Sequence, residues 1–180
     1  MKEVVKGDRK TSYDLIGVIY DSQMVSVDSR VPNKLVLQAL RKRGMEEFSE
    51  YDIIQPEYSY GHTRFDFFLA NEHERCLLET KSCTLVKEGV ALFPDAETER
   101  GRRHIRNLGK ARKEGYRVCV LFIVQRTDAN AFAPNAETDP EFAKVLRDAA
   151  LKGVEVYAYN MEISASFSSL SLSSKLNVYL

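Results

Sequence analysis

Alternating and periodic apolar positions along the chain predict an α/β protein. Apolar runs typical of strands fall at residues 51–60, 64–70, 75–84, 117–125 and 154–159. Segments with helical spacing fall at residues 31–43, 98–114 and 139–152. Residues 13–27 indicate two further short strands, joined by a turn at Asp21 and Ser22. From residue 31 onward the expected order of elements is therefore α-β-β-β-α-β-α-β.

This order predicts one mixed sheet with helices on both faces. The first three strands follow one another closely, as in an antiparallel meander, and the later strands alternate with helices, which is typical of parallel crossover units. The Ser-rich residues 164–174 are either disordered or, because apolar residues interrupt them, a tail packed on the domain. The sequence thus favours a three-layer α/β sandwich.

Composition supports a folded chain with its own core. Of the 180 residues, 44% are hydrophobic and 29% are charged, which excludes disordered, collagen-like and disulfide-scaffold proteins. Cys76, Cys83 and Cys119 have no Cys-x-x-Cys spacing, and we interpret them as small core residues. The longest apolar run, residues 118–124, is far shorter than the ~20 residues of a membrane-spanning helix. Residues 1–6 lack the pattern of a secretory signal, so we expect a cytoplasmic protein without a membrane segment.

Two acids and a lysine are brought together by the predicted hairpin of residues 64–70 and 75–84. With a four-residue loop at residues 71–74, Asp66 faces Glu79 across the two strands. The strand period of two then places Lys81 on the same face as Glu79. The apolar neighbours are expected on the opposite face: Phe65, Phe67 and Leu78.

Two facing carboxylates repel each other, and burying them is costly unless a proton or a cation lies between them. Mg²⁺ or Mn²⁺ would resolve this conflict, because such ions are commonly held by one or two carboxylates together with water and phosphate oxygens. Lys81 beside that ion could orient or deprotonate an attacking water. Glu57 is either a third acid of this metal site or an edge glutamate. The alternative interpretation of the whole pattern is a solvated hairpin face with a cross-strand lysine and glutamate pair.

Residues 97–117 form a basic block in a chain without net charge, with eight positive and three negative side chains. At ~100° per residue, Ile105, Leu108 and Ala111 fall on one arc of the predicted helix. The opposite arc carries five cations: Arg102, Arg103, Arg106, Lys110 and Lys113. This face suits a phosphate backbone, although a solvated helix face is the other interpretation. Arg100 and His104 lie at the edge of the apolar arc, and His104 is either a satisfied core residue or a site residue.

Several motifs resemble the sugar fermentation stimulation protein family, over residues 31–180. They are Pro32-Asn33, Arg64-Phe65-Asp66-Phe67, Glu79-Thr80-Lys81-Ser82-Cys83-Thr84-Leu85, Phe93-Pro94-Asp95-Ala96-Glu97-Thr98-Glu99-Arg100-Gly101 with His104, and Gly153-Val154-Glu155-Val156. The resemblance implies a DNA-binding protein with a restriction-endonuclease-like fold of the PD-(D/E)xK nuclease type. Under this resemblance Asp66, Glu79 and Lys81 match the nuclease motif. The family's signature loop and following helix match Asp95, Thr98, Arg100 and His104.

Two departures from the family pattern stand out. Members typically begin with a small OB-type module, so we expect a remnant of it at residues 1–28 and the nuclease-like domain at residues 29–180. Related nucleases often carry a glutamate on the helix before the meander, whereas residues 31–43 contain no acid and Gln38 occupies the plausible position. Metal binding would then be weaker than in the general pattern.

These observations predict a nucleic-acid-binding protein that is a metal-dependent phosphodiesterase. Asp66 and Glu79 would hold Mg²⁺ or Mn²⁺, and Lys81 would position the water. Phosphate contacts with nucleic acid, in the first place DNA, are expected from Arg100, Arg102, Arg103, Arg106 and Lys110. The alternative is a non-catalytic DNA-binding regulator of sugar metabolism on the same fold. A scaffold or interaction domain, the third class, would leave the acid pair unexplained.

Overall fold

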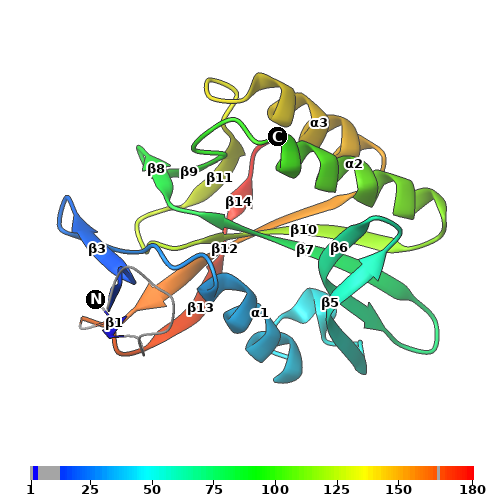
Figure 1. Cartoon of the computed structure of the whole chain (residues 1–180), viewed down its shortest axis with the longest axis horizontal. Coiled ribbons are helices and arrows are strands. Elements are labelled where there is room, and N and C mark those ends of the chain that lie inside the picture. Colours follow the sequence, from blue (N-terminus) through cyan, green and yellow to red (C-terminus); the bar gives the residue numbers. More distant parts are fainter. Residues whose placement is uncertain (1, 4–12, 166) are drawn as a thin grey trace.

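The computed structural model describes residues 2–3, 13–165 and 167–180, and it confirms the expected α/β class (Figure 1). Helix α1 spans Val31–Arg41, α2 spans Glu99–Lys113 and α3 spans Pro140–Leu151. A single 3₁₀ turn, η1, covers Glu46–Phe48. Each helix lies within two or three residues of its predicted position, because apolar spacing together with caps and prolines marks helix ends in the sequence.

A six-stranded mixed sheet forms the centre, in the order β13-β12-β10-β7-β6-β5. The meander β5 (Ile53–Tyr60), β6 (Thr63–Ala70) and β7 (Arg75–Cys83) is antiparallel, as predicted. Strands β7, β10 (Arg117–Val124) and β12 (Glu155–Ile163) are parallel. The Ser-rich tail contributes β13 (Leu170–Lys175), which pairs antiparallel with β12 and closes this edge of the sheet.

A second sheet contradicts the expectation of one sheet. It has four strands in the order β14-β11-β9-β8, with bounds Asn177–Val178, Ala131–Pro134, Val90–Phe93 and Leu85–Lys87. These strands have two to four residues. Such short strands show too few alternations to stand out in a sequence.

Residues 13–27 contain the predicted hairpin. Strands β3 (Gly17–Tyr20) and β4 (Gln23–Ser26) pair antiparallel, and Asp21 and Ser22 between them have positive φ angles of 49° and 63°. A two-residue turn of this kind matches the twist of its strands. A further small sheet pairs β1 (Lys2–Glu3) with β2 (Tyr13–Asp14). Residues 4–12, part of the proposed OB remnant, lie outside the described residues, and the division at residue 28 stays a prediction.

Each face of the central sheet has its own core. Helices α2 and α3 cover one face, where Ile105, Leu108 and Phe122 are fully buried. Helix α1 covers the other face, with Val36 and Leu121 fully buried there. Both crossovers of the parallel strands place their helices on the same side, as right-handed connections require. All three cysteines are buried and free, as predicted.

Asp139 aligns the two helices of the upper layer. It caps α3 by accepting a hydrogen bond from the Phe142 N–H at 2.8 Å, and it also accepts the Thr98 N–H at 2.9 Å. Arg102 of α2 donates to both Asp139 oxygens at 2.7 and 2.8 Å. Burial alone would raise the pKa of this carboxyl, but these hydrogen bonds and the arginine charge lower it below its usual range. The prediction that Arg102 faces outward is therefore wrong, because its guanidinium joins α2 to α3.

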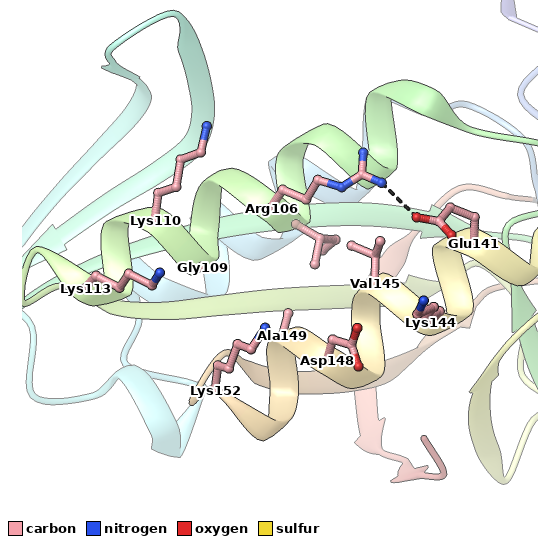
Figure 2. Close-up of a pocket in the computed structure, with 11 residues that line it drawn as sticks. Arg106, Gly109, Lys110, Lys113, Glu141, Lys144, Val145, Asp148, Ala149 and Lys152 are labelled. Carbon is pink, nitrogen blue, oxygen red and sulfur yellow. Dashed lines mark hydrogen bonds and ion pairs between the residues drawn. The ribbon is translucent and has the colours of Figure 1, made fainter.

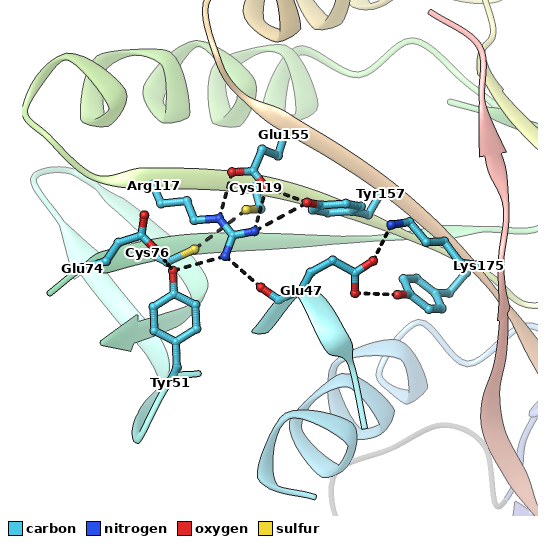
Figure 3. Close-up of polar contacts among 10 residues, drawn as sticks. Glu47, Tyr51, Glu74, Cys76, Arg117, Cys119, Glu155, Tyr157 and Lys175 are labelled. Carbon is cyan, nitrogen blue, oxygen red and sulfur yellow. Dashed lines mark hydrogen bonds and ion pairs between the residues drawn. The ribbon is translucent and has the colours of Figure 1, made fainter. Parts of the chain in front are cut away.

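A polar network crosses the face of the sheet that α1 covers (Figure 3). Arg117, at the start of β10, donates to the Glu155 carboxylate at 2.8 and 2.7 Å and to the Glu47 carbonyl at 2.8 Å. The Glu47 carboxylate accepts from Tyr159 at 2.7 Å and from Lys175 at 2.5 Å. The charges in this network are mutually paired, and it ties η1 to β10, β12 and β13.

Candidate functional site

The strand register at the site agrees with the prediction. Strand β6 pairs with β7 at Phe67 with Leu78, and the pairing continues to the loop at residues 71–74. It stops one position before Asp66 and Glu79, where the two strands separate. The Asp66 carboxylate instead accepts the backbone N–H of Thr80 at 2.7 Å. Asp66 thus lies at the point where the ladder opens.

Side-chain alternation fails at this point of β6. Phe67 and Leu78 pack in the core under α1, as expected of a shared face, but Phe65 packs in the other core with α2 and α3. The prediction that Phe65 and Phe67 share a face is wrong. Glu57, on β5 opposite Asp66, has a φ of 55°, and the pairing of β5 with β6 skips these two residues. A positive φ is unfavourable for a residue with a Cβ, and at Glu57 it interrupts the regular side-chain alternation of β5.

Asp66 is fixed by the first helix. The Asn33 side-chain amide, in the first turn of α1, donates to Asp66 Oδ1 at 2.7 Å. Gln38 is exposed and is not among the residues that line the groove beside Asp66, and its match to the missing helix acid stays a prediction. Burial, and then the negative charge of Glu79, raise the pKa of the Asp66 carboxyl. The two acids are thus close enough to interact electrostatically.

Glu79 is buried on the side of the sheet that α2 covers, and only 3% of it is exposed. Its Oε1 lies 2.5 Å from Lys81 Nζ and 2.5 Å from His104 Nδ1. Its Oε2 is buried without a hydrogen-bond partner among the described residues. Burial alone would raise the pKa of Glu79, but the hydrogen bond from His104 and the charge of Lys81 lower it. Both donors hold one oxygen and leave the other unsatisfied.

His104 is buried and hydrogen-bonded, as expected of a satisfied core histidine, and its partner is the candidate site residue Glu79. It projects from α2 onto Glu79, and its ring edge contacts the Phe65 ring at a centroid distance of 6.2 Å. The helical spacing placed it toward the sheet, and the structure brings it to the same carboxylate as Lys81.

A groove of about 340 Å³ opens beside Asp66, between α1 and strands β5 and β6. Asn33, Glu57 and Asp66 are among its lining residues. Glu57 is exposed, with its carboxylate 3.8 Å from the Arg64 guanidinium. In the part of the chain that the structure describes, no three His, Cys, Asp or Glu side chains are grouped closely enough to hold a metal ion. Glu57 thus shares a groove with Asp66 but completes no three-residue metal cluster.

The two acids nevertheless fit a divalent ion. The unsatisfied Glu79 Oε2 is a buried carboxylate oxygen that is free to accept a donor or to bind a cation. Asp66 is the second carboxyl, and its pKa is raised by burial and by the negative charge of Glu79. Two carboxylates are enough for Mg²⁺, which keeps several water ligands.

The residues of the signature loop and of the basic helix have several different roles in the structure. Thr98 caps α2 by accepting the Gly101 N–H at 3.0 Å, and Asp95 is exposed. Arg100, Arg103, Arg106 and Lys110 are exposed, as expected of a phosphate-binding face. Arg106 is paired with Glu141 at 2.9 Å. Arg103 and Lys110 also line a groove of about 540 Å³ against the turn between β5 and β6.

Two contacts of Asp66 were not predicted from the sequence, those with the Asn33 side chain and with the Thr80 backbone. Asn33 belongs to a motif that marked the family resemblance, so a signal for its importance was present. Its contact with Asp66 spans 33 positions in sequence and cannot be inferred from local spacing.

None of the helices among the described residues has the length and apolar character needed to cross a bilayer.

Comparison with known proteins supports the resemblance. The family model "Sugar fermentation stimulation protein RE domain" matches residues 30–167. A sugar fermentation stimulation protein homolog of Caldanaerobacter subterraneus subsp. tengcongensis is 43% identical over 175 residues, which cover 97% of this chain and 76% of that protein. A homolog from Desulforamulus reducens is 47% identical over 156 residues, covering 87% of this chain and 65% of that protein.

A solved structure has the same fold. The SfsA protein of Pyrococcus furiosus, determined in complex with Ca²⁺, superposes with a TM-score of 0.90 at 28% identity. The match covers 99% of this chain and 76% of that one. The architecture is the expected restriction-endonuclease-like α/β fold, with a mixed central sheet between helical layers. On the family match and on this similarity, the chain belongs to the sugar fermentation stimulation protein family.

Proposed function

We propose that this protein is a metal-dependent phosphodiesterase that acts on nucleic acid. The observation that carries the proposal is the buried, unpartnered Glu79 Oε2, held in place by Lys81 and His104 next to a second acid, Asp66. The family's nuclease-like fold is compatible with a nucleic-acid-related role. Such an enzyme would act in the cytoplasm, with DNA as the first substrate to test.

Asp66 and Glu79 would hold Mg²⁺ or Mn²⁺. The Ca²⁺ in the Pyrococcus relative supports a divalent ion here, since Ca²⁺ and Mg²⁺ both take oxygen ligands. The ion would supply a water of lowered pKa and a positive charge for the phosphoryl group. Asn33 and the Thr80 N–H fix the Asp66 carboxylate, so it would not have to reorganise when it binds the ion.

Lys81 and His104 have different roles in this proposal. Lys81 reaches the site from the same strand as Glu79 and keeps 14% of its side chain exposed, so its ammonium can contact a water or a phosphate oxygen. His104 is 7% exposed and holds Glu79 from α2. It would be a positioning residue, because it is nearly as buried as Glu79 and its printed hydrogen bond is to that carboxylate. The exposed Arg100, Arg103 and Lys110 would contact the phosphate backbone.

A cleavage assay tests the proposal. Plasmid DNA, single-stranded DNA and RNA are incubated with the protein and Mg²⁺ or Mn²⁺, with EDTA as the negative condition. Lys81→Ala should lower the rate by about 10²- to 10⁴-fold, the usual contribution of a group that handles the proton. Lys87→Ala removes an exposed lysine from β8 and is the matched control. Cleavage that persists at the wild-type rate in Lys81→Ala would reject the assignment.

A second function is favoured by a specific observation. The α1 side chain that contacts Asp66 is the neutral amide of Asn33 and not an acid, and the described residues contain no three-residue metal cluster. A non-catalytic DNA-binding regulator of sugar metabolism would have this site without turnover. It predicts DNA binding that weakens steeply with salt and does not change in Lys81→Ala, together with no cleavage under any metal condition.

A further inference from the structure

A second groove lies between α2 and α3, away from the acid pair (Figure 2). Its volume is about 360 Å³, and it shares no lining residue with the groove beside Asp66. Its floor is apolar, formed by Ile105, Val145 and Ala149. Both helices contribute lysines to its margins, as Figure 2 shows. The groove thus combines an apolar floor with a charged rim.

The rim carries excess positive charge. It contains five basic side chains and two acidic ones, Glu141 and Asp148, which leaves an excess of three positive charges. Arg106 is neutralised by Glu141 at 2.9 Å. The other four cations have no ion pair among the described residues: Lys110, Lys113, Lys144 and Lys152. Lys113 lies in the last turn of α2, where it offsets the helix dipole, but Lys144 lies outside the last turn of α3 and has no such role.

Gly109 gives a second, independent indication of a ligand. It lies in the interior of α2, where glycine is a poor helix former compared with alanine. A Cβ built on Gly109 would meet no heavy atom within 4 Å, so no packing contact requires a glycine there. Gly109 lines the groove, and any larger side chain at this position would occupy it. The glycine therefore keeps the groove open at a cost to the helix.

We propose that this groove binds an acidic, amphipathic helical segment of a partner protein. Apolar side chains of such a segment would lie on the floor, and its carboxylates would meet the four lysines. From Lys144 to Lys152 the rim is ~12 Å long at 1.5 Å per residue, which matches about two turns of a bound helix. Lys110 also belongs to the face proposed to contact phosphate, whereas Lys113, Lys144 and Lys152 line this groove without that role, so the inference does not rest on the Asp66 and Glu79 site.

The chemistry of the groove favours a protein segment over nucleic acid. None of its lining residues among those described is aromatic, so bases would find no ring to stack on. Its one arginine is already paired, and the unpaired cations are lysines, which lack the bidentate fork that suits phosphate. The apolar floor would gain nothing from a phosphate backbone, whereas leucine side chains would bury it.

Peptide binding to the full chain tests the proposal. The probe is a labelled peptide of about 12 residues, roughly three helical turns, with leucines at i, i+3, i+4 and i+7 and glutamates elsewhere. A peptide of the same composition with this spacing broken is the first comparison, and a short DNA duplex is the second. Fluorescence anisotropy gives the dissociation constants. We expect the amphipathic peptide to bind tighter than the scrambled one.

Two variants and one matched control locate the binding. The double variant K144E/K152E changes the rim charge from an excess of three positive to one negative and should weaken peptide binding by about tenfold or more. Gly109→Leu fills the groove and should weaken it similarly, while its melting temperature stays the same or rises. Arg147→Glu changes the charge of an exposed residue of α3 outside the groove and should leave binding unchanged.

The same measurements can overturn the proposal. Equal binding of the two peptides, or no binding of the amphipathic one, would reject a helical partner. Equal effects of K144E/K152E and Arg147→Glu would reject the groove as the site. If the duplex binds and both groove variants weaken it while peptide binding is unaffected, the groove is a nucleic-acid surface and the proposal is wrong.

Discussion

Replacing Asp66 by asparagine removes one negative charge from the candidate site and keeps the size of the side chain. In the folded protein the pKa of Asp66 is raised by burial and by the charge of Glu79, so its carboxylate form is disfavoured relative to the unfolded chain. Asparagine can still accept the Thr80 N–H, and it can donate to Asn33 once the Asn33 amide turns over. We therefore expect Asp66→Asn to be more stable than the wild type at neutral pH.

The size of the gain follows from comparable substitutions. Relieving a destabilised functional position commonly adds roughly 0.5–2 kcal/mol to the free energy of unfolding. For a chain of this length, 1 kcal/mol shifts the melting temperature by roughly 2–4 °C. The variant should therefore melt about 1–8 °C above the wild type.

The pH dependence has a definite sign. Well below the ordinary value of 3.8, Asp66 is protonated in both states and its charge destabilises neither. As the pH rises through the raised folded-state pKa, the wild type loses stability relative to the variant, because the folded state must release a proton that it holds more tightly than the unfolded chain does. The difference in melting temperature, measured by circular dichroism from about pH 4 to about pH 8, should increase with pH.

A bound divalent ion should reverse the order of stability of the wild type and Asp66→Asn. A divalent ion at 100 times its dissociation constant stabilises a protein that binds it by roughly 2.7 kcal/mol. We expect Mn²⁺ to raise the melting temperature of the wild type more than that of Asp66→Asn. Asp52→Asn, which neutralises an exposed carboxylate paired with Arg43, is the control and should change neither quantity. An Asp66→Asn variant that is less stable at every pH, or a difference that does not depend on pH, would refute the reasoning.

Three further predictions concern the frame around the site. Leu108→Ala empties a fully buried position of α2 and should cost about 2–5 kcal/mol in urea denaturation; a midpoint equal to that of the wild type would contradict its place in the core. Asp139→Ala removes the cap of α3 and should cost about 1–2 kcal/mol, whereas Asp139→Asn, which keeps an acceptor, should cost less. All three cysteines are buried, and burial raises the pKa of Cys83 to about 12. A thiol reagent at neutral pH should therefore label them only after unfolding, and rapid labelling of the native protein would show an accessible thiol.

The register of the acid-bearing hairpin could be predicted because a short loop determines which residues of an antiparallel pair face each other. The loop at residues 71–74 places Phe67 opposite Leu78, and the ladder stops there, one position before Asp66 and Glu79. Likewise, Ile105 and Leu108 of α2 are buried as their helical spacing requires. These features depend on residues close in sequence, whose geometry is set by the period of their own element.

The features that could not be predicted from the sequence depend on residues distant in sequence or on the backbone conformation. Arg102 turns toward Asp139, a partner 37 positions away. Phe65 changes face where the pairing of β5 with β6 is interrupted at Glu57, whose positive φ cannot be predicted from a glutamate in the sequence. Asn33 reaches Asp66 only after α1 has packed beneath the sheet. In each case the tertiary structure determines where the side chain lies, and a local sequence pattern cannot predict it.

The contact between Asn33 and Asp66 has a consequence for how such sites evolve. Codons for asparagine and aspartate differ only in their first base, so a point mutation in the gene exchanges one for the other. Because the Asn33 side chain already lies 2.7 Å from Asp66, that exchange would bring a third carboxylate to the acid pair without any movement of the backbone. A site with two acids and a site with three would thus be one point mutation apart on the same scaffold.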